Sequence, residues 1–67
     1  MITIYVNDQK HQFSELISLQ AVLKELEIKE QGIAVAINEQ IISKSTWSDN
    51  ILNEADKVLI IKATQGG

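Results

Sequence analysis

The sequence predicts an α+β fold in which a mixed sheet of four to five strands packs on one main helix. Apolar and polar residues alternate at the start of the chain, apolar residues repeat with a helical period between residues 19 and 26, and a β-branched apolar run precedes the last four residues. With 67 residues, no proline and no linker-like stretch, the chain is expected to form one domain at residues 1–63, followed by a flexible tail at 64–67.

A hairpin of two short strands is predicted near the N-terminus. Ile2, Ile4 and Val6 alternate with more polar neighbours, which is the period of a half-buried strand. The polar stretch 7–9 is a turn signal, and alternation resumes over residues 10–13. The second strand is therefore expected to pair back on the first.

One helix is predicted after this hairpin. Ser18 is suited to be its N-cap, because a serine hydroxyl accepts hydrogen bonds from the first backbone N–H groups of a helix. Gly32, after a polar stretch, is expected to stop the helix or to lie in the following loop. Between the two, an apolar stripe with helical spacing consists of Leu19, Val22, Leu23 and Leu26.

A second hairpin is predicted in the middle of the chain. The continuous apolar run 33–37 suits a strand that is covered on both faces or has one face of small residues. Asn38 and Glu39 separate it from a short run at 40–42. Asn38 tolerates a positive φ, but Glu39 does not favour one, so the type of the turn stays open.

The closing strand at residues 57–63 is the most apolar, so we expect it in the middle of the sheet beside the first strand. An irregular connection at 43–53, with room for a helical turn at 45–47, precedes it. Hairpin, helix, hairpin and central closing strand make up a β-grasp (ubiquitin-like) arrangement, in which one face of the sheet holds the core and the other is open.

The open face is expected to bind a partner. Val58 and Ile60 should point to the helix, and Ala34 and Ala36 are candidates to share the other side. The alternative is that the connection at 43–53 folds over part of this apolar strip. We predict that the partner-binding surface consists of Tyr5, Leu59, Ile61 and Ala63.

Composition excludes several classes of function. The chain has no cysteine and one histidine, so it has no disulfide, no thiol nucleophile and no metal cluster. Its net charge of −3 and lack of arginine argue against nucleic-acid binding. No apolar run approaches the roughly 20 residues that span a bilayer, and the start does not resemble a signal peptide, so the cytoplasm is the expected location. His11 and Trp47 are expected to be structural residues.

The end of the chain is the remaining candidate for chemistry, because no Ser-His-Asp set or phosphate-binding loop occurs. Gln65, Gly66 and Gly67 form a slim segment, and glycine can pass through a channel too narrow for side chains. The Gly67 carboxylate could attack the α-phosphate of ATP, and a sulfur nucleophile could convert the adenylate to a thiocarboxylate. Without a thiol, the chain could carry sulfur only at this carboxyl group.

The most specific pattern of the chain consists of Ala36-Ile37-Asn38, Ile41-Ile42, Trp47, Leu52, Asp56, Val58, Ile60 and Gly66-Gly67. With these residues the whole chain resembles the ThiS family, the ubiquitin-like sulfur carriers of thiamine biosynthesis. The resemblance implies no cofactor on the carrier and no catalysis by it, since the carrier is a protein co-substrate. It implies adenylylation of Gly67 by a ThiF-type ATP-dependent activating enzyme, sulfur from a persulfide protein, and donation to a ThiG-type thiazole synthase.

Two departures and two alternatives accompany this resemblance. Ala55 stands where relatives usually have glycine, and it would be strained if the turn requires a positive φ. Arginines that are frequent in relatives near Ile42 and Ser43 are missing. The small subunit of molybdopterin synthase has the same fold and tail, although it is usually longer. The other alternative is a non-carrier ubiquitin-like module, which binds partners or is conjugated to lysines.

Overall fold

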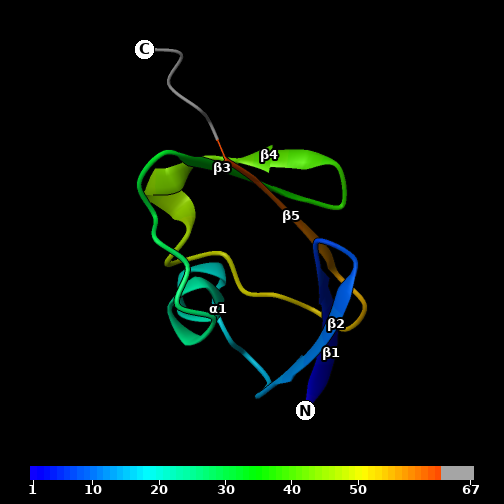
Figure 1. Ribbon diagram of the computed structural model, residues 1–67. Helices are drawn as coiled ribbons and strands as arrows, with labels where there is room; N and C mark the ends of the chain where they lie inside the picture. Colours follow the sequence, from blue (N-terminus) through cyan, green and yellow to red (C-terminus); the bar gives the residue numbers. More distant parts are fainter. Residues whose placement is uncertain (63–67) are drawn as a thin grey trace.

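The structure, a computed structural model, describes residues 1–62 of the chain. In this range one twisted sheet packs on a short helix (Figure 1). The elements in chain order are β1 (Ile2–Val6), β2 (Gln9–Phe13), α1 (Leu19–Glu25), β3 (Ile33–Ile37), β4 (Gln40–Ile42), the 3-10 turn η1 (Lys44–Thr46) and β5 (Lys57–Lys62).

The strand order in the sheet is β2-β1-β5-β3-β4, so the last strand lies in the middle. It runs parallel to β1 and antiparallel to β3. This arrangement confirms the predicted β-grasp fold and the predicted place of the closing strand. Ala63, which was expected to end that strand, lies outside the described residues.

Both hairpins close with two-residue turns of the same kind. Asn7 and Asp8 have φ angles of 49° and 69°, and Asn38 and Glu39 have φ angles of 50° and 72°. Positive φ at both central residues is the type I′ pattern, which matches the natural twist of paired strands. The turn that the sequence left open is therefore of this type, and Glu39 accepts the left-handed conformation.

The helix begins as predicted, and of the two expected places for Gly32 the structure has the loop. The Ser18 hydroxyl oxygen accepts a hydrogen bond from the Ala21 N–H at 3.1 Å. At the other end, Glu27 has a φ of 58° and donates to the Lys24 carbonyl, while the Ile28 N–H donates to the Leu23 carbonyl. These two bonds are the Schellman pattern, in which glycine usually takes the left-handed position. The stop is therefore Glu27, and Gly32 lies in the following loop.

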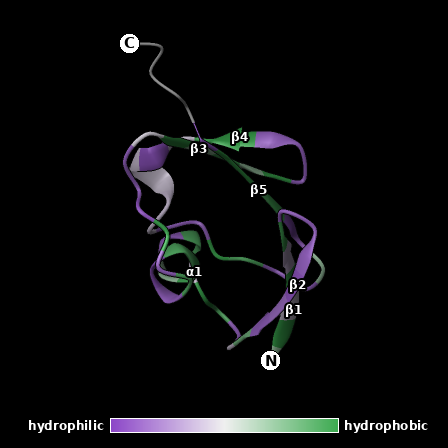
Figure 2. Ribbon diagram, viewed as in Figure 1, coloured by the Kyte–Doolittle hydropathy of each residue, from purple (hydrophilic) through white to green (hydrophobic). Residues whose placement is uncertain are grey.

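The connection between β4 and β5 packs beside the helix and closes the core. Trp47 and Leu52 are both only 2% exposed, and the Trp47 indole N–H donates to the Ile42 carbonyl at 3.1 Å. The Leu19 N–H donates to the Asn50 carbonyl at 2.8 Å, which ties this connection to the start of α1. Figure 2 shows apolar residues in α1 and in the strands facing it, whereas β2 is largely polar. No helix within residues 1–62 is long and apolar enough to cross a membrane.

The turn before β5 contains the alanine that the sequence singled out. Ala55 has a φ of 68°, and its N–H donates to the Thr3 carbonyl at 2.7 Å. The Thr3 N–H in turn donates to the Glu54 carboxylate at 2.9 Å. These bonds hold the turn in a left-handed geometry, so Ala55 takes the positive φ at which a strain was expected.

Ala55→Gly is therefore expected to stabilise the protein. The left-handed conformation costs a residue with a Cβ roughly 1–2 kcal/mol, partly offset by the larger unfolded-state entropy of glycine, so we expect a gain of about 0.5–1 kcal/mol. Chemical denaturation measures this change. Ala21→Gly, inside α1, is the matched control and should lose about 1 kcal/mol. Destabilisation by both substitutions would contradict the strain at Ala55.

Candidate functional site

The face of the sheet opposite α1 carries the predicted partner-binding residues. Leu59 is 51% exposed and Ile61 is 44% exposed, although both lie in the central strand of the sheet. Tyr5, in β1, is partly buried. Because Leu59 and Ile61 stay exposed while the connection packs beside α1, that connection does not cover these two residues. Ala63 lies outside the described residues.

Strand register extends this face beyond the predicted residues. Ala36 lies opposite Leu59 on one side and opposite Ile41 on the other, and Ala34 lies opposite Ile61. Partners across antiparallel strands share a face, and the small alanines leave the larger side chains prominent. We call the resulting surface, which comprises Ala34, Ala36, Ile41, Leu59 and Ile61, the open-face strip. Its exposed members are Ile41, Leu59 and Ile61, while Ala34 is partly buried and Ala36 is only 4% exposed between its larger neighbours.

Ile41 is the strip residue that sequence reasoning missed, and it is 66% exposed. Its signal was present in the chain, since a two-residue turn at Asn38 and Glu39 places Ile41 opposite Ala36.

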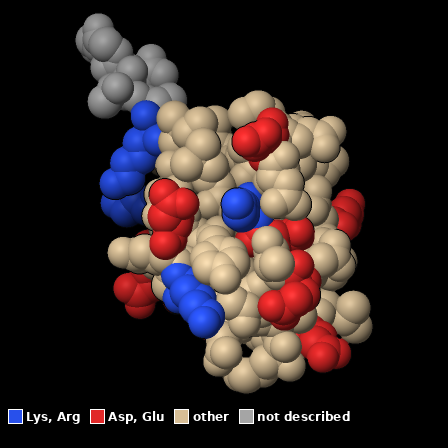
Figure 3. Space-filling view, turned by 90° about the vertical axis from the view of Figure 1, so that its right-hand side faces the viewer, with Lys and Arg blue, Asp and Glu red and all other residues tan. Residues whose placement is uncertain are grey.

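The charge around the strip is mixed. Lys57 lies opposite Tyr5 across β1 and β5, and Glu39 lies in the adjacent turn. Figure 3, which views the side that carries β1 and β2 in Figure 1, shows separated basic and acidic side chains rather than a basic cluster.

The start of β5 is held by a network around Asn38 and Asp56. The Asn38 side-chain oxygen accepts from the Lys57 N–H at 3.0 Å, and its amide group donates to the Asp56 carboxylate at 3.0 Å. The other Asp56 oxygen accepts from the Asn53 N–H at 2.8 Å. Asp56 therefore has a structural role in the turn before β5, and Asn38 does more than form a turn.

Further along β5, the side chain of Asn7, in the turn of the other hairpin, also forms hydrogen bonds with the strand backbone. Its side-chain oxygen accepts from the Ile60 N–H at 2.8 Å, and its amide group lies 3.4 Å from the Ile60 carbonyl. Its own N–H donates to the Val58 carbonyl at 2.9 Å. The carboxamide thus takes the place of one more peptide unit of β1, and β5 is held from both hairpins before it reaches the C-terminal segment.

The described residues present an exposed apolar strip, and none of the other candidate groups among them forms a reactive cluster. Within residues 1–62 no group of three or more His, Asp or Glu side chains could hold a metal ion. His11 is partly buried and stacks on Phe13, with ring centroids 6.0 Å apart. Gln65, Gly66 and Gly67, where the sequence predicts the chemistry, lie outside the described residues. What the structure brings together is an exposed apolar strip on the strand that leads to them.

Comparison with known proteins gives one consistent family. The model of the ThiS family matches residues 2–67. The chain is similar to the sulfur carrier protein ThiS of Escherichia coli (strain K12), with 31% identity over 64 residues that cover 96% of this chain and 97% of that protein. It is also similar to part of a thiazole synthase of Paramagnetospirillum magneticum, with 30% identity over 64 residues that make up 20% of that protein.

A solved structure supports the fold independently. The crystal structure of the thiamine biosynthesis protein ThiS from Geobacter metallireducens superposes with a TM-score of 0.85 and covers 98% of this chain and 100% of that chain. The sequence identity is 16%, so this likeness bears on the fold alone.

Asn7→Gly is expected to lower the free energy of unfolding by about 1–2 kcal/mol, because it removes the side-chain bonds to Ile60. Glycine keeps the positive φ of 49° available, so the loss reports the carboxamide and not the turn. Asp8→Gly, in the same turn, is the control and should be neutral or slightly stabilising. Equal effects of the two substitutions in urea denaturation would contradict the role of Asn7.

Proposed function

The chain belongs to the ThiS family, and we propose that it is a sulfur carrier that donates sulfur for thiazole formation in thiamine biosynthesis. The observation that carries this proposal is the match along nearly the whole length of a relative named sulfur carrier protein ThiS. The protein acts as a co-substrate, in keeping with the lack of a catalytic arrangement among residues 1–62.

The reaction takes place at the carboxylate of Gly67. One carboxylate oxygen attacks the α-phosphate of ATP, and pyrophosphate leaves. The terminal sulfur of a persulfide protein then attacks the acyl carbon of the adenylate, and AMP leaves. A thiol of the activating enzyme then attacks the cysteine sulfur of the persulfide protein and breaks the remaining S–S bond. This leaves a thiocarboxylate on Gly67 and a disulfide between the activating enzyme and the persulfide protein. Gly66 and Gln65 belong to the segment that enters the enzyme.

A ThiF-type activating enzyme and a ThiG-type thiazole synthase are the partners in this proposal. The similarity to one fifth of a protein named thiazole synthase supports the second, because a carrier-like segment and a synthase share that polypeptide. Tyr5, Leu59, Ile61 and Ala63 are proposed to contact the partners. The exposure of Leu59 and Ile61 supports this assignment, since exposed contiguous apolar side chains are typical of binding sites.

Deleting Gly67, or replacing Gly66 by phenylalanine, is expected to abolish activation without unfolding the domain, because the residues of the hydrophobic core all lie within the range 2–60. Purified protein is incubated with the activating enzyme, ATP and a sulfur donor, and intact mass is recorded. The wild type should gain the mass difference between sulfur and oxygen at Gly67. A wild type of unchanged mass, under conditions that convert the Escherichia coli relative, would reject the proposed function. Unfolding of either variant would instead reject the prediction that the domain folds independently of its last two residues.

Leu59→Ala and Ile61→Ala are each expected to raise the KM of the activating enzyme for the carrier by about tenfold, as for central residues of an interface. Adenylylation is followed by pyrophosphate release at several carrier concentrations. Leu16→Asn is the matched control, because Leu16 is 81% exposed, lies in the loop before α1, and has a φ of 65° that asparagine tolerates. A rise in KM for the control as large as for the strip variants would reject the strip as the docking surface.

A further inference from the structure

The central strand loses one neighbour before its end. The β1–β5 ladder contains the residue pairs Tyr5 with Lys57 and Val6 with Val58, and the Asn7 carboxamide extends it to Ile60. In a strand, the backbone groups of alternate residues point to the same side. The next groups on this edge are therefore the N–H and C=O of Lys62, and no residue within 1–62 pairs with them there.

On its other side, β5 stays paired. Ile61 lies opposite Ala34 in β3, and Lys62 lies opposite Ile33. The backbone at Lys62 is thus already extended and held in a sheet. Its free side has the geometry of a sheet edge, which is a template for another extended chain.

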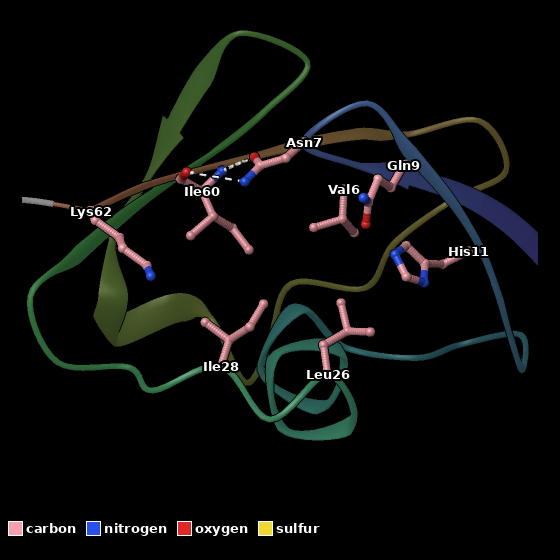
Figure 4. Close-up of a pocket in the computed structure, with 8 residues that line it drawn as sticks. All are labelled: Val6, Asn7, Gln9, His11, Leu26, Ile28, Ile60 and Lys62. Atoms are coloured by element: carbon pink, nitrogen blue, oxygen red, sulfur yellow. Dashed lines mark hydrogen bonds between the residues drawn. The ribbon is translucent and has the colours of Figure 1, made fainter.

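A hollow of about 380 Å³ lies next to this free edge, between the sheet and the end of α1 (Figure 4). Its apolar lining comes from Val6, Leu26, Ile28 and Ile60, and Lys62 borders it at one end. Residues paired across a sheet share a face. A residue of an added strand opposite Lys62 would therefore direct its side chain toward this hollow.

We propose that an extended segment of the activating enzyme pairs with the free edge of β5 at Lys62 and places one apolar side chain in the hollow. This inference rests on the proposed function. The unpaired N–H and C=O can form hydrogen bonds with another polypeptide backbone, and the apolar lining of the hollow can bind an apolar side chain, as in known strand-addition complexes. The open-face strip lies on the face of the sheet opposite to the hollow. The enzyme would therefore contact β5 on both faces as well as along its free edge.

The length of the remaining chain argues for an enzyme that acts on Gly67 as the partner, and the activating enzyme is the first such enzyme in the proposed function. Five residues follow Lys62, and when extended they span roughly 17 Å. An enzyme that binds ATP next to Gly67 must therefore have its surface within this distance of Lys62. Pairing at Lys62 sets the direction in which the C-terminal segment enters its active site.

The variants Lys62→Pro and Lys62→Ala separate the backbone from the side chain. Proline removes the N–H on the free edge, and it costs no β3–β5 bond because the Lys62 N–H does not face β3. We expect Lys62→Pro to raise the KM for adenylylation about tenfold, the cost of one lost backbone hydrogen bond at an interface. Lys62→Ala keeps the N–H and should change KM by less than about twofold. Equal KM values for the two variants would overturn the inference.

Amide hydrogen exchange measured by NMR tests the same contact in the unmodified protein. In the complex with the activating enzyme and without ATP, the Lys62 amide should exchange at least about tenfold more slowly than in the free protein. The Leu16 amide, in the loop before α1, is the control and should not change. Formation of the adenylate with unchanged exchange at Lys62 would reject the inference alone. Failure of the wild type to form any adenylate would reject the proposed function and this inference together.

Discussion

The fold depends on how the central strand is held. β5 has a neighbour on each side, and each neighbour ends in a type I′ turn that begins with asparagine. Asn38 bonds the start of β5 and Asn7 bonds its fourth residue through side-chain amides. Because both asparagines are in a left-handed conformation that this residue tolerates better than most, one residue type meets the needs of the turn and of the strand beside it.

Buried and exposed side chains alternate along β5, so one strand contributes to the core, to the open face and to the link with the C-terminal segment. Val58 is 2% exposed in the core and Ile60 packs against it from the same face, while Leu59 and Ile61 project to the open face. Lys62 then leads to the C-terminal segment. Since successive side chains of a strand point to opposite faces, burying one set fixes the exposure of the other. The exposed open-face strip is thus a consequence of the register that forms the core, and a register shift by one residue would destroy both.

Much of this could be predicted from the sequence, because the signals were local. Period-two alternation indicated the hairpins, and the spacing of Leu19, Val22 and Leu23 indicated the helix. The helix stop was missed because Glu27 holds a left-handed position where glycine is the usual signal. Ile41 was missed although the local hairpin register already places it opposite Ala36. The bonds of Asn7 to Ile60 depend on strand register between segments far apart in the chain, which no short pattern contains. The hollow beside Lys62 was missed for the same reason, since it lies between elements from three parts of the chain.

The position of the strip and the free edge also constrains how a carrier of this kind works. A stable protein–protein contact covers about 800 Å² on each partner, and any enzyme that acts on Gly67 has to bind around Lys62, from which only five residues remain. In the proposed function both enzymes act at Gly67, and under that proposal they compete for the same part of the surface. Activation and sulfur donation must then follow one another by release and rebinding, which favours an interface of moderate affinity. A short apolar strip with small alanines between its larger residues suits that requirement better than a deep pocket would, because it buries enough area to orient the carrier without holding it.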